Sequence, residues 1–150
     1  MSETRCPECG TVLPEGVTCQ TVFDEFLVLE FTDPEYGEVH MLTVACYMVQ
    51  HGRYSDAGLV WIEQRLRDYL ERGIPARLIR QGAAHETGQG VRNWKVTRQP
   101  GDTPQAQINW SMSIVDVALQ YEGAAGYRER VTEWAQSVLR EMQPLVDKTA

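Results

Sequence analysis

The sequence lacks the features that insert a chain into a membrane or export it. Its longest stretch without a charged residue runs from Val39 to Gly52, fourteen residues when His40 and His51 are counted as neutral. A transmembrane helix needs about 20 apolar residues. The N-terminus, Met-Ser-Glu-Thr-Arg, carries an acidic residue and is not followed by an apolar run, so it does not resemble a signal peptide. We therefore expect a cytoplasmic protein that does not bind a membrane.

Basic residues are scarce, above all in the first third of the chain. The sequence has 14 Lys and Arg against 21 Asp and Glu, a formal net charge of -7, and Arg5 is the one basic residue within residues 1–51. The middle of the chain is locally basic, but its arginines alternate with acidic residues, which is typical of a solvated helix face. Nucleic-acid binding relies on a large basic surface, so we expect no nucleic-acid partner.

The sequence also lacks the common catalytic and nucleotide-binding motifs. It contains no Gly-x-Ser-x-Gly, no Walker loop, no His-Glu-x-x-His and no Gly-x-Gly-x-x-Gly. It has only four cysteines and three histidines in 150 residues. A chain of this length can bury a sufficient core without disulfides, so we expect residues 1–150 to form a single domain whose cysteines are free for other chemistry.

The hydrophobic pattern predicts a mostly helical α+β fold. Residues 1–18 are rich in turn formers and are predicted to form a loop that packs on two helices, at about residues 19–31 and 38–51. Residues 55–81 and 114–142 are also predicted to be helical. Residues 82–90 are predicted to form a flexible loop after the first of these regions.

One segment changes from helical to alternating periodicity. Trp94-Lys95-Val96-Thr97 and Ile108-Asn109-Trp110-Ser111-Met112 alternate as strands do, and a Pro- and Gly-containing loop separates them. The pattern predicts a small β-hairpin within residues 92–113.

The strongest chemical signal is Cys6-Pro7-Glu8-Cys9-Gly10. Two thiolates at this spacing can bind one Zn²⁺ in a tight turn, and Gly10 can adopt the positive φ that such a turn often requires. In a reducing compartment the spacing favours a metal over a disulfide. A thioredoxin-like redox pair is disfavoured because nothing resembling a strand precedes Cys6. We therefore predict an N-terminal zinc knuckle.

A structural zinc ion needs two further ligands. If the helices at 19–31 and 38–51 are antiparallel, Cys19 lies beside His51, while His40 lies at the far end, about 16 Å from His51 along the helix axis. Cys46 points away from His51 on the same helix, so only one of these two can join the site. The predicted ligand set is Cys6, Cys9, Cys19 and His51, with Cys46 or His40 as alternatives for the fourth position. His85 lies in the predicted loop and is the weakest candidate.

Two other functions of such a site remain open. Three protein ligands and a water would make a catalytic zinc, as in a hydrolase, with Asp24 or Glu25 available as a general base. Alternatively, the thiols could respond to oxidation by releasing the metal, as in a redox sensor.

The chain resembles an uncharacterised bacterial family of small proteins with a Cys-Pro-x-Cys-Gly motif, a domain of unknown function. The resemblance covers most of the chain and is carried by Cys6-Pro7-x-Cys9-Gly10, Cys19 and His40-x-Leu42-Thr43-Val44-x-x-Tyr47-x-x-Gln50-His51, and more weakly by Trp94-Lys95-Val96-Thr97, Ser113-Ile114-Val115-Asp116-Val117 and Val131-x-x-Trp134-Ala135. It implies that Cys6, Cys9, Cys19 and His51 act together and that His40 has a role, but it implies no reaction. We expect a zinc-binding interaction module, rather than an enzyme, with a protein or a small molecule as its partner.

Overall fold

The computed structural model describes residues 3–88 and 95–147, over which the chain forms eight helices and one small antiparallel sheet. The predicted class, a mostly helical α+β fold with a small β-hairpin, is therefore confirmed. In chain order the elements are β1 (Glu3–Arg5), β2 (Val12–Pro14), α1 (Cys19–Thr32), α2 (Pro34–Gly37), α3 (His40–Gln50), α4 (Asp56–Leu70), α5 (Ala76–Gly88), α6 (Ile114–Leu119), α7 (Gly123–Glu141) and α8 (Gln143–Asp147).

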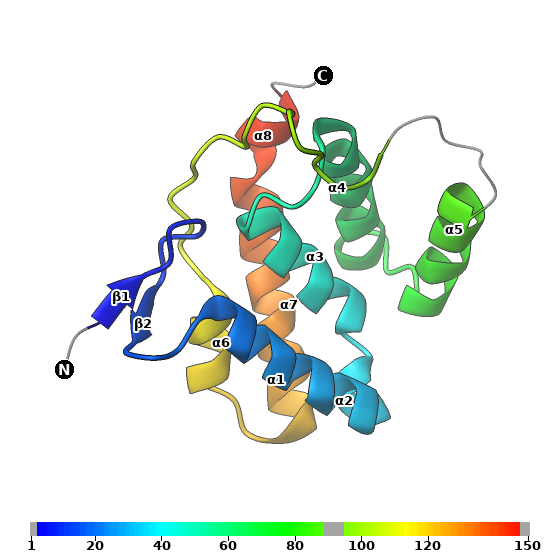
Figure 1. Ribbon diagram of the computed structural model, residues 1–150. Coiled ribbons are helices and arrows are strands. Elements are labelled where there is room, and N and C mark those ends of the chain that lie inside the picture. Colours follow the sequence, from blue (N-terminus) through cyan, green and yellow to red (C-terminus); the bar gives the residue numbers. More distant parts are fainter. Residues whose placement is uncertain (1–2, 89–94, 148–150) are drawn as a thin grey trace.

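Helix α7 runs through the centre of the molecule, and α3 packs against it (Figure 1). Their facing side chains form the core, in which Trp134, Val138 and Leu42 are completely buried. Two buried polar groups of this core are paired with each other, since Trp134 Nε1 donates to Gln50 Oε1 over 3.2 Å. The hairpin β1–β2 lies on one side of α3, and α5 lies on the other side, beyond α4 (Figure 1).

Helices α1 and α3 lie antiparallel, which is the arrangement assumed when the sequence placed Cys19 beside His51. Thr18 caps α1, because its hydroxyl accepts a hydrogen bond from the Thr21 backbone N–H over 3.1 Å. Contacts between the two helices join residues of opposite ends, such as Gln20 with Tyr47 and Glu30 with His40. The start of α1 and the end of α3 therefore meet at one end of this pair.

The prediction that residues 92–113 form the β-hairpin is wrong, because the hairpin lies at residues 3–14. Residues 89–94, which include Trp94, lie outside the described residues, and residues 95–113 form an irregular connection rather than paired strands. Near its start, this connection pairs with the segment between α3 and α4 through an isolated bridge of Thr97 with Tyr54, with Ser55 N–H donating to Val96 O and Arg98 N–H to Arg53 O. Val96, Ile108, Trp110 and Met112 of this connection are partly buried against the core. The hairpin that does form, β1–β2, has strands of only three residues, paired Glu3 with Pro14 and Arg5 with Val12.

Three helix boundaries also differ from the prediction. Helix α5 continues to Gly88, so the loop predicted at 82–90 is helical over most of its length. The helix predicted at 38–51 begins at His40 and is preceded by the single turn α2, which Asp33 caps by accepting from the Glu35 backbone N–H. The helical region predicted at 114–142 consists of two helices, α6 and α7, and α7 begins at Gly123, which has a positive φ.

Ser55 caps helix α4, and the first turn of this helix brings Gly58 against the backbone of Val96. Ser55 Oγ accepts from the Gly58 backbone N–H over 2.9 Å and donates to Lys95 O over 2.5 Å. A Cβ on Gly58 would lie 2.2 Å from Val96 O. Only glycine therefore allows this close approach of backbone to backbone.

We expect Gly58→Ala to lower the free energy of unfolding by about 1–3 kcal/mol, because the Val96 backbone must move away. Urea denaturation measures the effect. Gly82→Ala is the matched control, since Gly82 is helical and has nothing within 4 Å of an added Cβ, so it should leave the stability unchanged or raise it by up to about 1 kcal/mol. Equal midpoints for the two variants would contradict this packing.

Among residues 3–88 and 95–147, no helix combines the length and the apolar character that a membrane span requires.

Candidate metal centre

The connection between β1 and β2 folds into a tight turn that carries Cys6 and Cys9. The Cys6 backbone N–H donates to Thr11 O over 2.8 Å, and the Gly10 backbone N–H donates to Cys6 O over 2.9 Å. The Cys9 backbone N–H is directed at Cys6 Sγ, 3.5 Å away. Gly10 has a φ of 81°, as predicted for this position. The turn thus orients both sulfurs toward its interior, where the two residues are buried.

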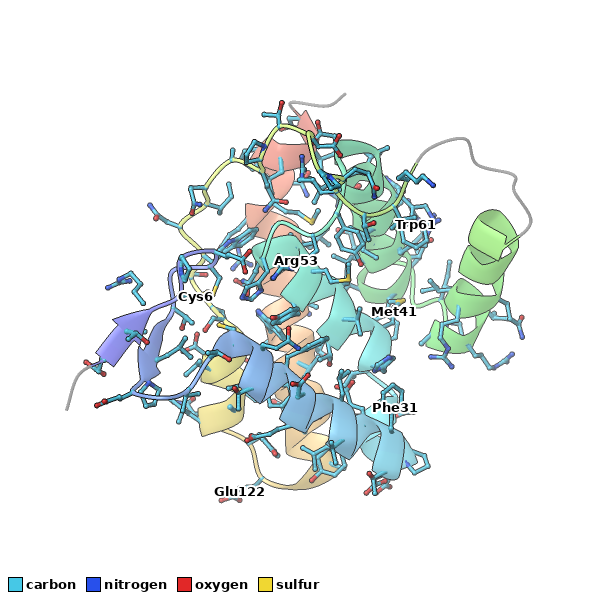
Figure 2. The ribbon with its side chains drawn as sticks, in the orientation of Figure 1. Cys6, Phe31, Met41, Arg53, Trp61 and Glu122 are labelled. Atoms are coloured by element: carbon cyan, nitrogen blue, oxygen red, sulfur yellow. The ribbon has the colours of Figure 1, made fainter. Side chains whose placement is uncertain are left out.

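Two helix ends meet this turn. Cys19 is the first residue of α1, and His51 is the C-cap residue of α3. Because the two helices are antiparallel, the start of α1 and the end of α3 are neighbours, and both side chains are buried. Figure 2 shows Cys6 close to this end of the helix pair, with Arg53 beside it and Phe31 at the opposite end.

The four predicted ligands come together in space. One ligand atom from each of Cys6, Cys9, Cys19 and His51 lies within 4.8 Å of all the others, and the Cys9 and Cys19 sulfurs are 3.6 Å apart. Tetrahedral zinc, with Zn–S near 2.3 Å and Zn–N near 2.0 Å, requires ligand atoms about 3.5–3.8 Å apart. The cluster therefore needs only small side-chain adjustments to surround one ion.

Contacts with Tyr47 orient the His51 ring for metal binding. Its Nδ1 is 2.7 Å from Tyr47 O, one turn earlier in α3, and its ring stacks on the Tyr47 ring with centroids 4.1 Å apart. The N–H on Nδ1 donates to that carbonyl, so Nε2 is left as a lone-pair donor. Nε2 is buried and has no hydrogen-bond partner among the described residues. A metal-ligating histidine commonly has its other nitrogen fixed in this way.

The proximity of the thiols shifts their titration. A hydrogen bond from the Cys19 thiol lowers the pKa of Cys9, because it stabilises the Cys9 thiolate. The same contact, together with burial, raises the pKa of Cys19. Because zinc binds thiolates, a metal at this site would displace the proton that the two sulfurs share.

Three polar contacts hold the turn against the helical body. Arg53 donates to both carboxylate oxygens of Glu8, over 3.0 and 3.1 Å, and Thr11 Oγ1 lies 2.8 Å from Ser113 Oγ. Ser113 is the N-cap residue of α6 and forms a capping box, in which the Asp116 carboxylate accepts from the Ser113 backbone N–H over 2.7 Å. These contacts are partly exposed, so they contribute less to stability than a bound metal would.

The alternative ligands lie elsewhere. Cys46 is a completely buried core thiol, and burial raises its pKa. His40 is bonded to Glu30 at the other end of α3. Asp24 and Glu25 are exposed on α1 and are not part of the cluster, so the site has no carboxylate of theirs to act as a base. The side chain of His85 lies outside the described ones.

Sequence reasoning missed the groups that surround the cluster. Tyr47 orients His51, and its spacing of four residues on one helix is a signal that could have shown this. The Glu8–Arg53 pair joins residues 45 positions apart and has no local signal.

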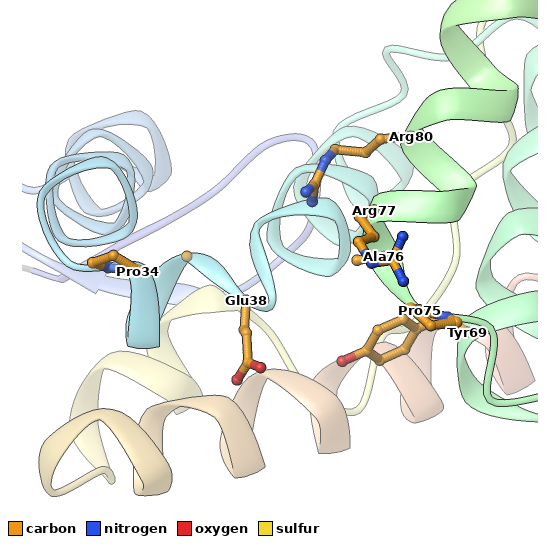
Figure 3. Close-up of a pocket in the computed structure, with 8 residues that line it drawn as sticks. Pro34, Glu38, Tyr69, Pro75, Ala76, Arg77 and Arg80 are labelled. Atoms are coloured by element: carbon orange, nitrogen blue, oxygen red, sulfur yellow. The ribbon is translucent and has the colours of Figure 1, made fainter.

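Two hollows on the surface differ in their distance from the cluster. One, of about 370 Å³, borders the cluster and is lined by residues that include Glu8, His51 and Trp110. The other, of about 510 Å³, lies between α2 and the start of α5, where Glu38, Tyr69, Arg77 and Arg80 surround it (Figure 3). The second contains no thiol or imidazole among its lining residues, so the metal-ligating chemistry belongs to the first.

The fold and this site define a small helical α+β protein with a buried Cys3His cluster between an N-terminal turn and two helix ends. The chain belongs to the family of unknown function DUF5946, which it matches over residues 4–143. No curated protein and no solved structure matches the chain.

Proposed function

We propose that this protein is a zinc-binding interaction module whose structural Cys3His centre fastens the N-terminal turn to the helical body. The observation that carries the proposal is the buried Nε2 of His51, which has no hydrogen-bond partner among the described residues and belongs to a cluster with three sulfurs. A buried, unpartnered ring nitrogen is unfavourable unless a ligand or ion accepts its lone pair. Zinc fits this donor set, because three thiolates and one imidazole are common ligands of structural zinc.

The closed ligand set favours a structural over a catalytic role. Four protein ligands complete a tetrahedral shell and leave no position for a water. We infer that the function is binding, of a protein or a small molecule, with the hollow bordered by Glu8, His51 and Trp110 as the place closest to the metal. All four cysteines are free thiols, which suits a reducing compartment such as the cytoplasm.

Metal analysis of the purified protein tests the proposal. We expect one zinc per wild-type chain and a zinc affinity lowered at least about 100-fold in His51→Ala, because removal of a ligand exceeds the 10–100-fold effect of removing an outer partner. His40→Ala is the matched control and should retain one zinc, since its ring is bonded to Glu30 instead. Wild-type protein free of zinc, or equal zinc loss in the two variants, would overturn the proposal.

A second candidate, a thiol-based redox sensor, is favoured by one contact. The sulfurs of Cys9 and Cys19 are 3.6 Å apart, so oxidation that joins them would remove two metal ligands at once. Mild hydrogen peroxide should then release zinc in proportion to the thiols lost. Zinc that stays bound after peroxide treatment would contradict the redox-sensor function and leave only the structural role.

A further inference from the structure

A second polar cluster is buried at the opposite end of the α1–α3 pair, and the zinc proposal does not use it. The side chain of Glu30 is completely buried, and its carboxylate contacts three neighbours. His40 Nδ1 lies 2.7 Å from Oε1, while the hydroxyls of Thr43 and Tyr127 donate to Oε2 over 2.5 and 2.6 Å. Three helices, α1, α3 and α7, therefore converge on one carboxylate.

The donors in this cluster are fixed by burial. Burial and the hydrogen bond to Glu30 raise the pKa of Tyr127. The phenol therefore keeps its proton and donates a hydrogen bond to the carboxylate. A buried carboxylate is destabilising by several kcal/mol unless it is paired and fully hydrogen-bonded. An apolar residue at position 30 would avoid this penalty. The arrangement therefore suits a carboxylate that has a task beyond filling the core.

His40 connects this carboxylate to the surface. Its side chain is 28% exposed, whereas the Nδ1 edge is engaged by the buried Glu30. When Nδ1–H donates to Glu30, the ring presents Nε2 as a lone-pair donor on its other edge. An imidazole that a buried carboxylate orients in this way is the arrangement that activates histidine in nucleophilic and acid–base sites.

An apolar surface adjoins the exposed edge of His40. Phe31 is 75% exposed, and its ring centroid lies 4.9 Å from that of His40. Val28, which precedes it by three residues on α1, is 65% exposed. A large exposed aromatic residue beside an oriented imidazole offers a place for the apolar part of a small ligand.

We propose that His40, oriented by Glu30, is a second reactive site, which accepts acyl groups from small aromatic or apolar esters held against Phe31. Nε2 attacks the ester carbonyl carbon, the bond from that carbon to the alcohol oxygen breaks, and the alkoxide leaves with the electron pair and takes a proton from a water molecule. The proton on Nδ1 moves to Glu30, which leaves a neutral acylimidazole. The hydroxide formed from that water attacks the acyl carbon, the bond to Nε2 breaks, the acid is released, and Nδ1 regains its proton from Glu30. One ester and one water thus yield one acid and one alcohol.

The steady-state hydrolysis of p-nitrophenyl acetate by the zinc-loaded protein tests this site. We expect His40→Gln and Glu30→Gln each to lower the rate by about tenfold or more, in keeping with the contribution of a positioned histidine. His85→Gln is the control for an ordinary histidine of this chain and should change the rate by less than about twofold. Phe31→Ser should raise KM with little change in kcat, since Phe31 supplies only apolar contact. Circular dichroism verifies that each variant is folded.

A labelling experiment keeps the proposal testable if Glu30→Gln does not fold. Diethyl pyrocarbonate modifies histidines that present an accessible lone pair, and mass spectrometry locates the label. We expect His40 to be modified and His51 to be protected while zinc is bound. Equal hydrolysis by wild-type and His40→Gln proteins, or a His40 that stays unmodified, would overturn the proposal, whatever the zinc content proves to be.

Discussion

Replacing Cys19 with serine is expected to abolish stoichiometric zinc binding, whereas replacing Cys46 with serine is expected to leave it intact. Both residues are buried cysteines of adjacent, antiparallel helices, but only Cys19 belongs to the cluster of ligand atoms. Serine is a poor zinc ligand at neutral pH because its hydroxyl does not ionise there. We expect the zinc affinity to fall at least about 100-fold, beyond the range seen for outer partners.

The Cys46→Ser control separates metal binding from packing. Cys46 is completely buried among apolar neighbours, so the new hydroxyl should lower the free energy of unfolding by about 1–3 kcal/mol. Zinc content per folded chain, measured by mass spectrometry of the metal, should remain at one. Retention of full zinc by Cys19→Ser, or loss of zinc by Cys46→Ser at temperatures where it is folded, would contradict the assignment of ligands.

Removal of the metal is expected to release the N-terminal turn while the helical body stays folded. Within residues 3–18, Leu13 and the two cysteines are the buried apolar residues, so this segment has little core of its own. The binding free energy of structural zinc is in effect folding free energy for such a segment. The body, by contrast, has Trp134, Val138 and their neighbours completely buried, so we expect it to stay folded without the metal.

Hydrogen exchange with and without a chelator measures this release. After chelation we expect the backbone amides of Cys6 and Gly10, which are bonded within the turn, to exchange at least about 100-fold faster, as in a locally unfolded segment. The amides of α7 should change little. Loss of protection throughout α7 would show that the whole fold needs the metal. Unchanged exchange rates in the turn would show that the metal does not stabilise the turn.

The sequence was sufficient for those parts of the site that depend on helical geometry. The apolar periodicity of α1 and α3, together with a tight connection, placed Cys19 beside His51 and His40 about 16 Å away, and the contact of His40 with Glu30 agrees with that register. The Cys-x-x-Cys spacing and Gly10 predicted the turn, including its positive φ. Both patterns are local, so neither required knowledge of the tertiary structure.

The parts that escaped prediction depend on long-range contacts. Alternation in residues 95–113 indicates extended backbone but not its partner, and here the partners are Arg53 and Ser55 rather than a second strand. The cluster around Glu30 includes Tyr127, 97 residues away, and nothing in the local sequence links the two. The strands β1 and β2 have three residues each, too few to show a period.

X-ray absorption spectroscopy of the zinc-loaded protein tests the central claim most directly, because it reports the ligand atoms themselves. We predict three sulfurs at about 2.3 Å and one nitrogen at about 2.0 Å, with no oxygen in the shell. His51→Ala should replace that nitrogen with an oxygen from water while the three sulfurs remain. A wild-type shell with only two sulfurs, or with a water in place of the imidazole, would contradict a closed Cys3His centre formed by Cys6, Cys9, Cys19 and His51.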